Sequence, residues 1–316
     1  MRIALAGSGL LAEKLFEALR GSKHEVVALI QNGRAVQNWG RRAAAMKARL
    51  RLPGRSVIKM AGRAGAPIVW IDKMDEEELA PLRAIGPDLI LVGGFSIILK
   101  PPLLGLPRIG CVNTHSSLLP RHRGPNPFTA VILSGDTETG VTFHIMEPGI
   151  DTGPIVAQYP VAVPPDADAR AVFTETAKLA GARVCEVMDR IEAEGLHGEP
   201  QDESQATYEK APRLPDTFLY WTEPAADLER RVRALYPIMP ARVLYKGHTI
   251  RVLRAKAEAA DTARDAPPGA VLPSRYGLRV ATGAGALHIQ TAVATFPVPW
   301  LWPNVFSRPK PGEMLE

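Results

Sequence analysis

The 316-residue chain contains only two cysteines and no long apolar run. Cys111 and Cys185 are too few for a disulfide framework or a cysteine-ligated metal site, and they fit a reducing cytosol. No segment approaches the length of a membrane span, and the N-terminus lacks the charged-then-apolar form of a signal peptide. We therefore expect a cytoplasmic protein without membrane association and without a bound metal.

Acidic residues are missing from residue 26 to residue 71, although the whole chain holds 33 of them. A run of like charge is usually a solvated helical face, but a phosphate-facing surface has the same composition, and both interpretations stay open. The formal charge of +5 and a pI near 9.3 favour an anionic partner. The basic residues of this stretch are Arg34, Arg41, Arg42, Lys47, Arg49, Arg51, Arg55, Lys59 and Arg63.

Hydrophobic residues make up 46% of the chain and charged residues 22%, as in a globular protein with a substantial core. In the N-terminal part, short apolar runs alternate with helical patterns, which predicts a doubly wound, Rossmann-like α/β domain with helices on both faces of a parallel sheet. Gly7-x-Gly9-x-x-Ala12 imitates a dinucleotide fingerprint. The acidic ribose ligand expected about 20 residues later is missing, so we interpret this stretch as a plain strand, turn and helix.

The C-terminal part has a different character. A helix is predicted over 166–194, a polar linker rich in Gly and Pro over 195–215, and a further helix over 223–235. Beyond Pro240, short strands are separated by Gly and Pro, which indicates a small OB-like β-barrel. We predict two domains, residues 1–200 and 201–316. The expected barrel strands are 241–245, 249–255, 269–272, 277–282 and 286–293.

Polar residues with catalytic chemistry lie between apolar runs from Cys111 to Gln158. Asn113 and His115 are two positions apart at the end of a predicted strand and would share one face. Asp151 follows in turn-forming sequence. An amide donor and a His oriented by an Asp can stabilise a carbonyl oxygen that gains charge and can move protons during acyl transfer. Cys111 lies inside an apolar run and is interpreted as a small buried hydrophobe.

The order of the motifs in this region resembles the folate-dependent formyltransferases. The resemblance is greatest to the enzymes that act on methionyl-tRNA, and the glycinamide ribonucleotide and sugar-nucleotide formyltransferases share the core. It implies that Asn113, His115 and Asp151 are catalytic. The matching segments are Asn113-Thr114-His115, Ser117-Leu118-Leu119-Pro120, Arg123-Gly124, Thr139-Gly140-Val141-Thr142 and Asp151-Thr152-Gly153.

The resemblance also implies the substrates. The formyl donor would be 10-formyltetrahydrofolate, with its pterin between the segments Gly93–Leu99 and Met146–Asp151, and the acceptor would be initiator methionyl-tRNA. The usual Arg-Pro-Ala-Gly-Arg-Gly-like loop of the tRNA enzymes is replaced here by Asn32-Gly33-Arg34 and Trp39-Gly40-Arg41-Arg42. The residues expected to bind the donor are Gly94, Phe95, Ile97, Leu99, Met146 and Gly149. Those expected to bind the acceptor are Ser117, Leu118, Leu119, Pro120, Arg123, Arg41, Arg42 and Lys47.

Two other functions remain open at this point. The acceptor amine could belong to an amino sugar nucleotide or a specialised metabolite instead of a tRNA. The chain could also be a non-catalytic relative that binds RNA or protein, although the intact set of Asn113, His115 and Asp151 argues against this. A formyl-transfer assay with and without charged tRNA separates the three.

Overall fold

The computed structural model describes residues 1–33, 56–259, 263, 265–294 and 309–315. The chain forms two compact units, each made of segments that are not contiguous in sequence. The first unit contains residues 1–127, 138–162 and 173–210, and the second contains residues 128–137, 163–172 and 211–316.

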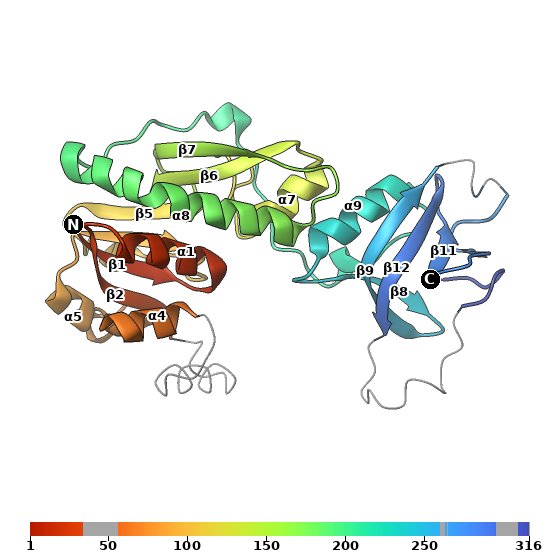
Figure 1. Cartoon of the computed structure of the whole chain (residues 1–316), viewed down its shortest axis with the longest axis horizontal. Helices are drawn as coiled ribbons and strands as arrows, with labels where there is room; N and C mark the ends of the chain where they lie inside the picture. Colours follow the sequence, from red (N-terminus) through yellow and green to blue (C-terminus); the bar gives the residue numbers. More distant parts are fainter. Residues whose placement is uncertain (34–55, 260–262, 264, 295–308, 316) are drawn as a thin grey trace. The chain divides into compact units, whose positions relative to one another are not determined.

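The first unit is built on a seven-stranded sheet with the order β3-β2-β1-β4-β5-β6-β7 (Figure 1). Strands β1 to β5 pair in parallel, whereas β6 and β7 are antiparallel to their neighbours. The predicted doubly wound fold is confirmed, but the sheet is mixed: β6 runs antiparallel to β5, and β7 follows β6 as an antiparallel neighbour with no helix between them. The strands are β1 (Arg2–Gly7), β2 (Glu25–Asn32), β3 (Ile68–Ile71), β4 (Leu89–Gly93), β5 (Gly110–His115), β6 (Glu138–Ile145) and β7 (Ile155–Ala162).

Helices cover both faces of this sheet. Alternate residues of β4 show the division: Leu89 and Leu91 pack in one core cluster, and Ile90 and Val92 pack in the other. Helices α1, α4 and α8 contribute to the first cluster, and α5 and α6 contribute to the second. A strand buried on both faces explains why the β4 sequence is uniformly apolar. The helices are α1 (Gly9–Arg20), α4 (Val57–Ala64), α5 (Glu76–Ile85), α6 (Pro101–Leu104) and α8 (Ala169–Glu194).

The ends of β1 and β4 lie close together at the carboxyl edge of the sheet. A Cβ on Gly7 would come 2.0 Å from the Gly93 carbonyl oxygen, so only glycine fits at that position. From these adjacent strands the chain continues to opposite sides, to β2 from β1 and to β5 from β4. Open α/β sheets bind their ligands at such a switch point, which places the end of β5 next to the expected binding region.

The second unit contains a five-stranded antiparallel sheet, β10-β11-β12-β9-β8, that curls into a half-barrel. Helix α9 buries Leu228, Val232 and Leu235 in the core of this unit, together with the barrel residues Val252 and Leu287. The predicted barrel is therefore confirmed. The elements are α7 (Pro127–Ser134), α9 (Ala225–Leu235), β8 (Ala241–Tyr245), β9 (His248–Glu258), β10 (Val271–Leu272), β11 (Leu278–Ala281) and β12 (Ala286–Ala294), with short 3-10 turns η1 (Glu203–Gln205) and η2 (Pro215–Thr217).

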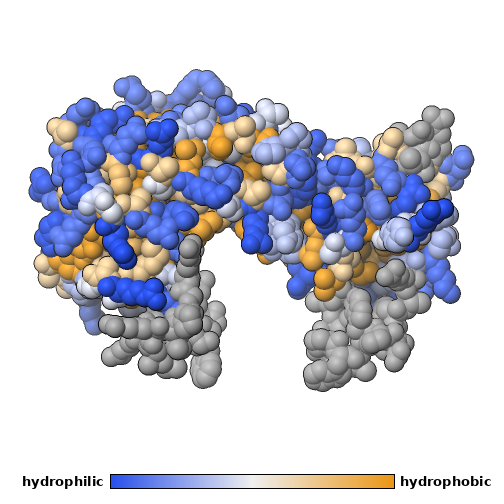
Figure 2. All heavy atoms as spheres, in the orientation of Figure 1, coloured by the Kyte–Doolittle hydropathy of each residue, from blue (hydrophilic) through white to orange (hydrophobic). Residues whose placement is uncertain are grey.

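Within the described parts of the chain, no helix combines the length and the hydropathy that a membrane crossing requires. Hydrophilic side chains cover much of the visible face in Figure 2, with smaller hydrophobic areas between them.

Candidate active site

Strand β5 carries Asn113 and His115 at its carboxyl end, beside β4 on one side and β6 on the other. Asn113 is half-buried, and His115 is 6% exposed. The antiparallel register pairs Asn113 with His144 and His115 with Thr142. The strand therefore presents an amide and an imidazole at the edge where the sheet is expected to bind ligands.

Asp151 reaches both of these side chains from the loop that follows β6. Its Oδ1 accepts a hydrogen bond from Asn113 Nδ2 at 3.3 Å, and its Oδ2 lies 3.6 Å from His115 Nδ1. The Gly124 backbone amide donates to the same Oδ2 at 2.9 Å. Asn113, His115 and Asp151, which the sequence predicted as one set, thus converge on one place.

The backbone around the site fixes the orientation of the His115 ring. Its Nε2 lies 2.9 Å from the carbonyl oxygen of His122, so Nε2–H donates to that carbonyl. The Nδ1 atom, which faces Asp151, is then the nitrogen that gains and loses the proton.

Burial and charge set the protonation states of the pair. Burial lowers the pKa of His115 below its usual value, although the Asp151 carboxylate and the His122 carbonyl oppose this effect. For Asp151, burial alone favours the neutral form, but the two nearby histidines and the Gly124 amide outweigh it and lower the pKa to about 2. At neutral pH the site therefore holds a neutral His115 beside an ionised Asp151.

His144 is a member of the site that sequence reasoning did not include. Its Nε2 lies 3.1 Å from Asn113 Nδ2 and 3.5 Å from Asp151 Oδ1. Its Nδ1–H donates to the Ile145 carbonyl at 3.0 Å, which leaves Nε2 as an acceptor for the Asn113 amide. Asn113 Nδ2 therefore contacts both His144 and Asp151.

The loop 117–120 was expected to contact the acceptor. Ser117 and Leu119 are buried, and Leu119 N donates to Thr142 Oγ1 at 3.1 Å. The Gln158 side chain donates to the Leu119 carbonyl at 2.7 Å, and the Leu119–Pro120 peptide is cis. The backbone of this loop is thus fixed to β6 and β7, while Leu118 and Pro120 are half-buried. Contact of this loop with an acceptor stays a prediction.

Arg123 was also expected to bind the acceptor, but its side chain is 0% exposed. Its guanidinium contacts Gln201, Glu203 and Tyr208. Sequence reasoning assigned these three residues to a linker or to no site. This placement favours a structural role for Arg123, which is developed below.

The residues expected to hold the donor lie on two segments that meet at one core cluster. Phe95 and Ile97 pack on the cluster that includes Leu99, and Met146 packs on it from the other segment. The Met146 amide donates to the Cys111 carbonyl at 2.9 Å, which fixes the start of the 146–151 turn. A Cβ on Gly94 would come 2.8 Å from the Ser8 carbonyl oxygen, and one on Gly149 would come 2.3 Å from Thr152 Oγ1. Apolar side chains and close backbone packing of this kind suit a flat heterocycle.

Cys111 carries no catalytic chemistry in this arrangement. The thiol is buried against α6, where it contacts the carbonyls of Leu103 and Leu104, and burial raises its pKa to about 12. A thiol with that pKa is not a nucleophile at neutral pH. Its interpretation as a small buried hydrophobe agrees with the structure.

Three of the basic residues that were expected to bind the acceptor are not placed by the structure. Arg41, Arg42 and Lys47 lie outside the described residues.

Among the residues described, His24, Asp189 and Glu192 have ligand atoms within 4.8 Å of one another. Lys23 Nζ already lies 3.0 Å from Asp189 Oδ1 and 3.1 Å from Glu192 Oε2, so a cation occupies this cluster.

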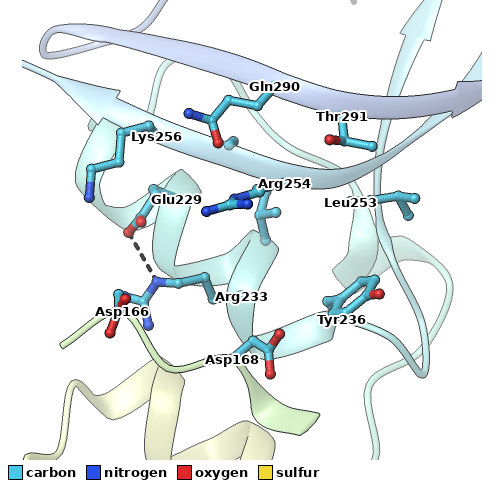
Figure 3. Close-up of a pocket in the computed structure, with 12 residues that line it drawn as sticks. Asp166, Asp168, Glu229, Arg233, Tyr236, Leu253, Arg254, Lys256, Gln290 and Thr291 are labelled. Carbon is cyan, nitrogen blue, oxygen red and sulfur yellow. Dashed lines mark hydrogen bonds and ion pairs between the residues drawn. The ribbon is translucent and has the colours of Figure 1, made fainter. Parts of the chain in front are cut away.

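A cavity of about 570 Å³ opens in the second unit between α9, β9, β12 and the segment before α8 (Figure 3). Arg254 and Lys256 alternate on β9, both exposed, and face the cavity near Arg233 of α9. Arg233 is paired with Glu229 at 3.2 Å and donates to the Ala167 carbonyl at 2.6 Å. The lining holds three basic residues, Arg233, Arg254 and Lys256, and three acidic ones, Asp166, Asp168 and Glu229. Arg254 and Lys256 are the two basic residues that come from β9.

Comparison with known proteins gives two family matches. Residues 1–188 match the family model described as formyl transferase, and residues 214–294 match the model of the formyl transferase C-terminal domain. The methionyl-tRNA formyltransferase of Roseiflexus castenholzii is 33% identical over 294 residues, covering 92% of this chain and 90% of the relative. That of Methylococcus capsulatus is 36% identical over 290 residues, covering 92% and 91%.

Solved structures share the fold at lower identity. An N-formyltransferase from Helicobacter canadensis, in complex with folinic acid and dTDP-3-aminofucose, superposes with a TM-score of 0.66 at 16% identity, covering 92% of this chain and all of the other. HypX from Aquifex aeolicus, in complex with tetrahydrofolic acid, gives a TM-score of 0.63 at 18% identity, covering 92% of this chain and 44% of the other.

Proposed function

The chain belongs to the formyl transferase family, and from this we propose that it transfers a formyl group from 10-formyltetrahydrofolate to the amino group of methionyl-tRNA. The observation that carries the proposal is the match to methionyl-tRNA formyltransferases over 92% of the chain, which includes the C-terminal domain. We assign the transfer to the first unit, which extends to residue 210, beyond the predicted boundary at 200, and the additional tRNA surface to the second unit, in the cytoplasm.

The chemistry follows from the geometry of Asn113, His115 and Asp151. The acceptor amine attacks the formyl carbon, and the formyl oxygen gains negative charge as the carbon becomes tetrahedral. Asn113 Nδ2 donates to this oxygen and gives up its contact with His144 or Asp151 to do so. The developing charge is thereby stabilised without a nucleophilic side chain.

Proton transfer is assigned to His115. The neutral ring accepts the proton of the attacking amine at Nδ1, and the Asp151 carboxylate 3.6 Å away stabilises the imidazolium that forms. The imidazolium also stabilises the oxyanion. When the bond from the formyl carbon to the folate nitrogen breaks, that nitrogen takes the proton, so charges and atoms balance.

The direct test is formyl transfer with a folate donor and two kinds of acceptor. We expect turnover with charged initiator tRNA and little with a free amino sugar nucleotide. If the protein formylates small amines and ignores methionyl-tRNA, the acceptor assignment is wrong and the small-amine function replaces it. If neither acceptor is formylated by a folded sample, the chain is a binding relative.

Binding of the donor should stabilise the protein against heat. A folate analogue at 100 times its Kd stabilises the folded state by about 2.7 kcal/mol through mass action. We expect 5-formyltetrahydrofolate to raise the Tm by roughly 5 °C, measured by scanning calorimetry. p-Aminobenzoylglutamate lacks the pterin and serves as the control ligand. An equal shift with both compounds would contradict the expected pterin site at Phe95, Ile97 and Met146.

Binding of tRNA should depend on Arg254 and Lys256. Each phosphate contact that releases counterions contributes about 0.9 to the slope of log K against log salt. The double variant Arg254→Ala/Lys256→Ala is expected to bind tRNA more weakly and to reduce this slope by about 1 to 2, with unchanged affinity for folate. Filter binding at salt concentrations from about 50 to about 200 mM measures the slope, because the affinity for nucleic acid changes strongly over this range.

The matched control removes the same charge elsewhere. Lys178 and Arg183 are exposed on α8 of the first unit, each paired with a glutamate on the same helix. Lys178→Ala/Arg183→Ala should leave the salt slope close to that of the wild type. Equal slopes for the two double variants would show that only net charge matters and that the β9 cations make no contact.

A further inference from the structure

The segment 199–209, called the brace here, connects the two loops that carry the site. At one end, Glu199 and Ile155 exchange backbone hydrogen bonds of 2.9 and 2.7 Å beside the Asp151 loop. At the other end, Arg123 N donates to the Thr207 carbonyl at 2.9 Å, and Glu209 N donates to the Arg123 carbonyl at 2.8 Å. The brace is therefore fixed to both loops through the backbone.

Arg123 is the side chain that the brace encloses. Its Nε and Nη2 donate to Gln201 Oε1 at 3.1 and 2.7 Å. Its Nη1 and Nη2 donate to the two carboxylate oxygens of Glu203 at 2.9 and 2.6 Å, and Nη1 also donates to the Tyr208 hydroxyl at 2.5 Å. A guanidinium has five N–H donors, and all five are used here, which leaves none for a substrate.

Gln201 transmits this arrangement to the Asp151 loop. Its Oε1 accepts from Arg123, while its Nε2 donates to the Asp151 carbonyl at 2.8 Å and to the Gly153 carbonyl at 2.7 Å. Asp151 has a φ of 56°, a left-handed backbone conformation that a non-glycine residue keeps only when its surroundings hold it. The two bonds from Gln201 provide such support.

The residues on either side of Arg123 hold the two reactive groups. The carbonyl of His122 orients the His115 ring at 2.9 Å, and the amide of Gly124 orients the Asp151 carboxylate at 2.9 Å. A rotation of the loop about Arg123 would move both contacts at once. The fixed guanidinium and the amide of Gln201 thus control the imidazole and the carboxylate together.

We propose that Arg123 and Gln201 are positioning residues, which align His115 and Asp151 for catalysis without touching either substrate. This inference rests on the proposed function of the site. It replaces the expectation that Arg123 contacts the acceptor, and it gives residues 199–209 a part in the reaction instead of a linker role alone.

The test replaces Gln201 by leucine in the full-length protein. Displacement of a catalytic pair by about 1 Å costs on the order of 100-fold in rate. Gln201→Leu is therefore expected to lower kcat by about 10- to 100-fold, with the KM values for folate and methionyl-tRNA within about twofold of the wild type. Gln205 is exposed on the same segment and its side chain donates to Asp202, so Gln205→Leu is the control.

A pH profile separates positioning from a loss of folded protein. Three titratable groups face the His115–Asp151 pair in the structure described: His144 from β6, His122 from the loop, and Glu209 behind His122. If Asp151 moves away from His115, the imidazolium loses its partner, and the acid limb of kcat should move to lower pH by about one unit. Partial unfolding would lower kcat equally at every pH.

Gln201→Glu keeps the test valid if the leucine variant does not fold. A carboxylate still accepts from Arg123, but it cannot donate to the carbonyls of Asp151 and Gly153. The expected result is the same loss of kcat and the same movement of the acid limb. Wild-type kcat in Gln201→Glu would overturn the proposal, as would an unmoved acid limb in both variants.

Asp151→Asn tells a failure of this inference from a failure of the proposed function. If Asp151→Asn is inactive while Gln201→Glu is fully active, the site assignment stands and the positioning role is wrong. If Asp151→Asn itself retains wild-type kcat, the proposed function of the site is wrong.

Discussion

Replacement of His115 by alanine, or of Asn113 by alanine, is expected to lower kcat for formyl transfer by about 100- to 1000-fold, the cost of one positioned proton acceptor or one preorganised donor. In the proposed mechanism, Asn113 supplies the amide donor to the formyl oxygen, and His115 supplies the proton acceptor. Both sit at the end of β5, where their truncation removes polar contacts with His144 and with the His122 carbonyl. Single-turnover formylation of methionyl-tRNA measures the effect without interference from product release.

The control for these variants is His197→Ala. His197 is exposed on the segment that follows α8 and has no place in the site. All variants should unfold in one or more transitions like those of the wild type, monitored by circular dichroism. Turnover within about threefold of the wild type in either site variant would show that the residue does not act on the reacting atoms, because loss of a single donor costs far more than that.

Asn113, His115 and Asp151 were predicted as one set because the ordered motifs around them resemble those of the folate-dependent formyltransferases; the local Asn-x-His pattern alone is common in loops. Asn113 and His115 share a strand, and Asp151 lies in the turn that follows the next strand. Burial of the apolar runs, together with the glycines between them, was enough to indicate the α/β sheet and the barrel. These features depend on residue order and periodicity, which can be read from the sequence.

His144 was missed for a definite reason. In sequence it is one polar residue in a strand of alternating pattern, and its position opposite Asn113 depends on the antiparallel register of β5 and β6. A sheet expected to be parallel gives no reason to pair these residues. The connection from β5 to β6 contains helix α7, so it gives no local sign that β6 runs antiparallel to β5.

Arg123 shows that sequence reasoning does not find contacts between residues far apart in the chain. It looks like a substrate contact because a basic residue follows a catalytic motif, but its partners Gln201 and Glu203 lie 78 and 80 residues further along the chain. No local sequence pattern predicts contacts between residues so far apart in the chain. The polar composition of 195–215, which suggested a linker, in fact supplies the partners of a fully buried guanidinium.

Replacement of Asp151 by asparagine is expected to lower kcat by about 100- to 10,000-fold, the range seen when a His–Asp pair loses its carboxylate. The amide has nearly the same size and still accepts from the Gly124 N–H, so the loop geometry is preserved. What disappears is the negative charge 3.6 Å from His115 Nδ1. The imidazolium formed during amine attack is then unstabilised in a buried site, and proton acceptance fails.

The substitution of Asp151 by asparagine should also change how the free energy of unfolding depends on pH. The pKa of Asp151 in the folded protein is lowered from 3.8 to about 2, so its ionised form stabilises the fold. Because folding lowers the pKa of this acid, its contribution to stability is present above about pH 4 and is lost as the pH falls toward 2. Urea unfolding should show Asp151→Asn less stable than the wild type by about 2 kcal/mol at pH 7, with the difference shrinking below pH 4. Asp136→Asn, in the second unit, provides the comparison. Part of the expected loss falls roughly between pH 7 and pH 3. If the difference in the free energy of unfolding stays constant over this range, Asp151 is not an ionised group held by His115 and His144. The negative charge on which the proposed proton transfer depends would then be missing.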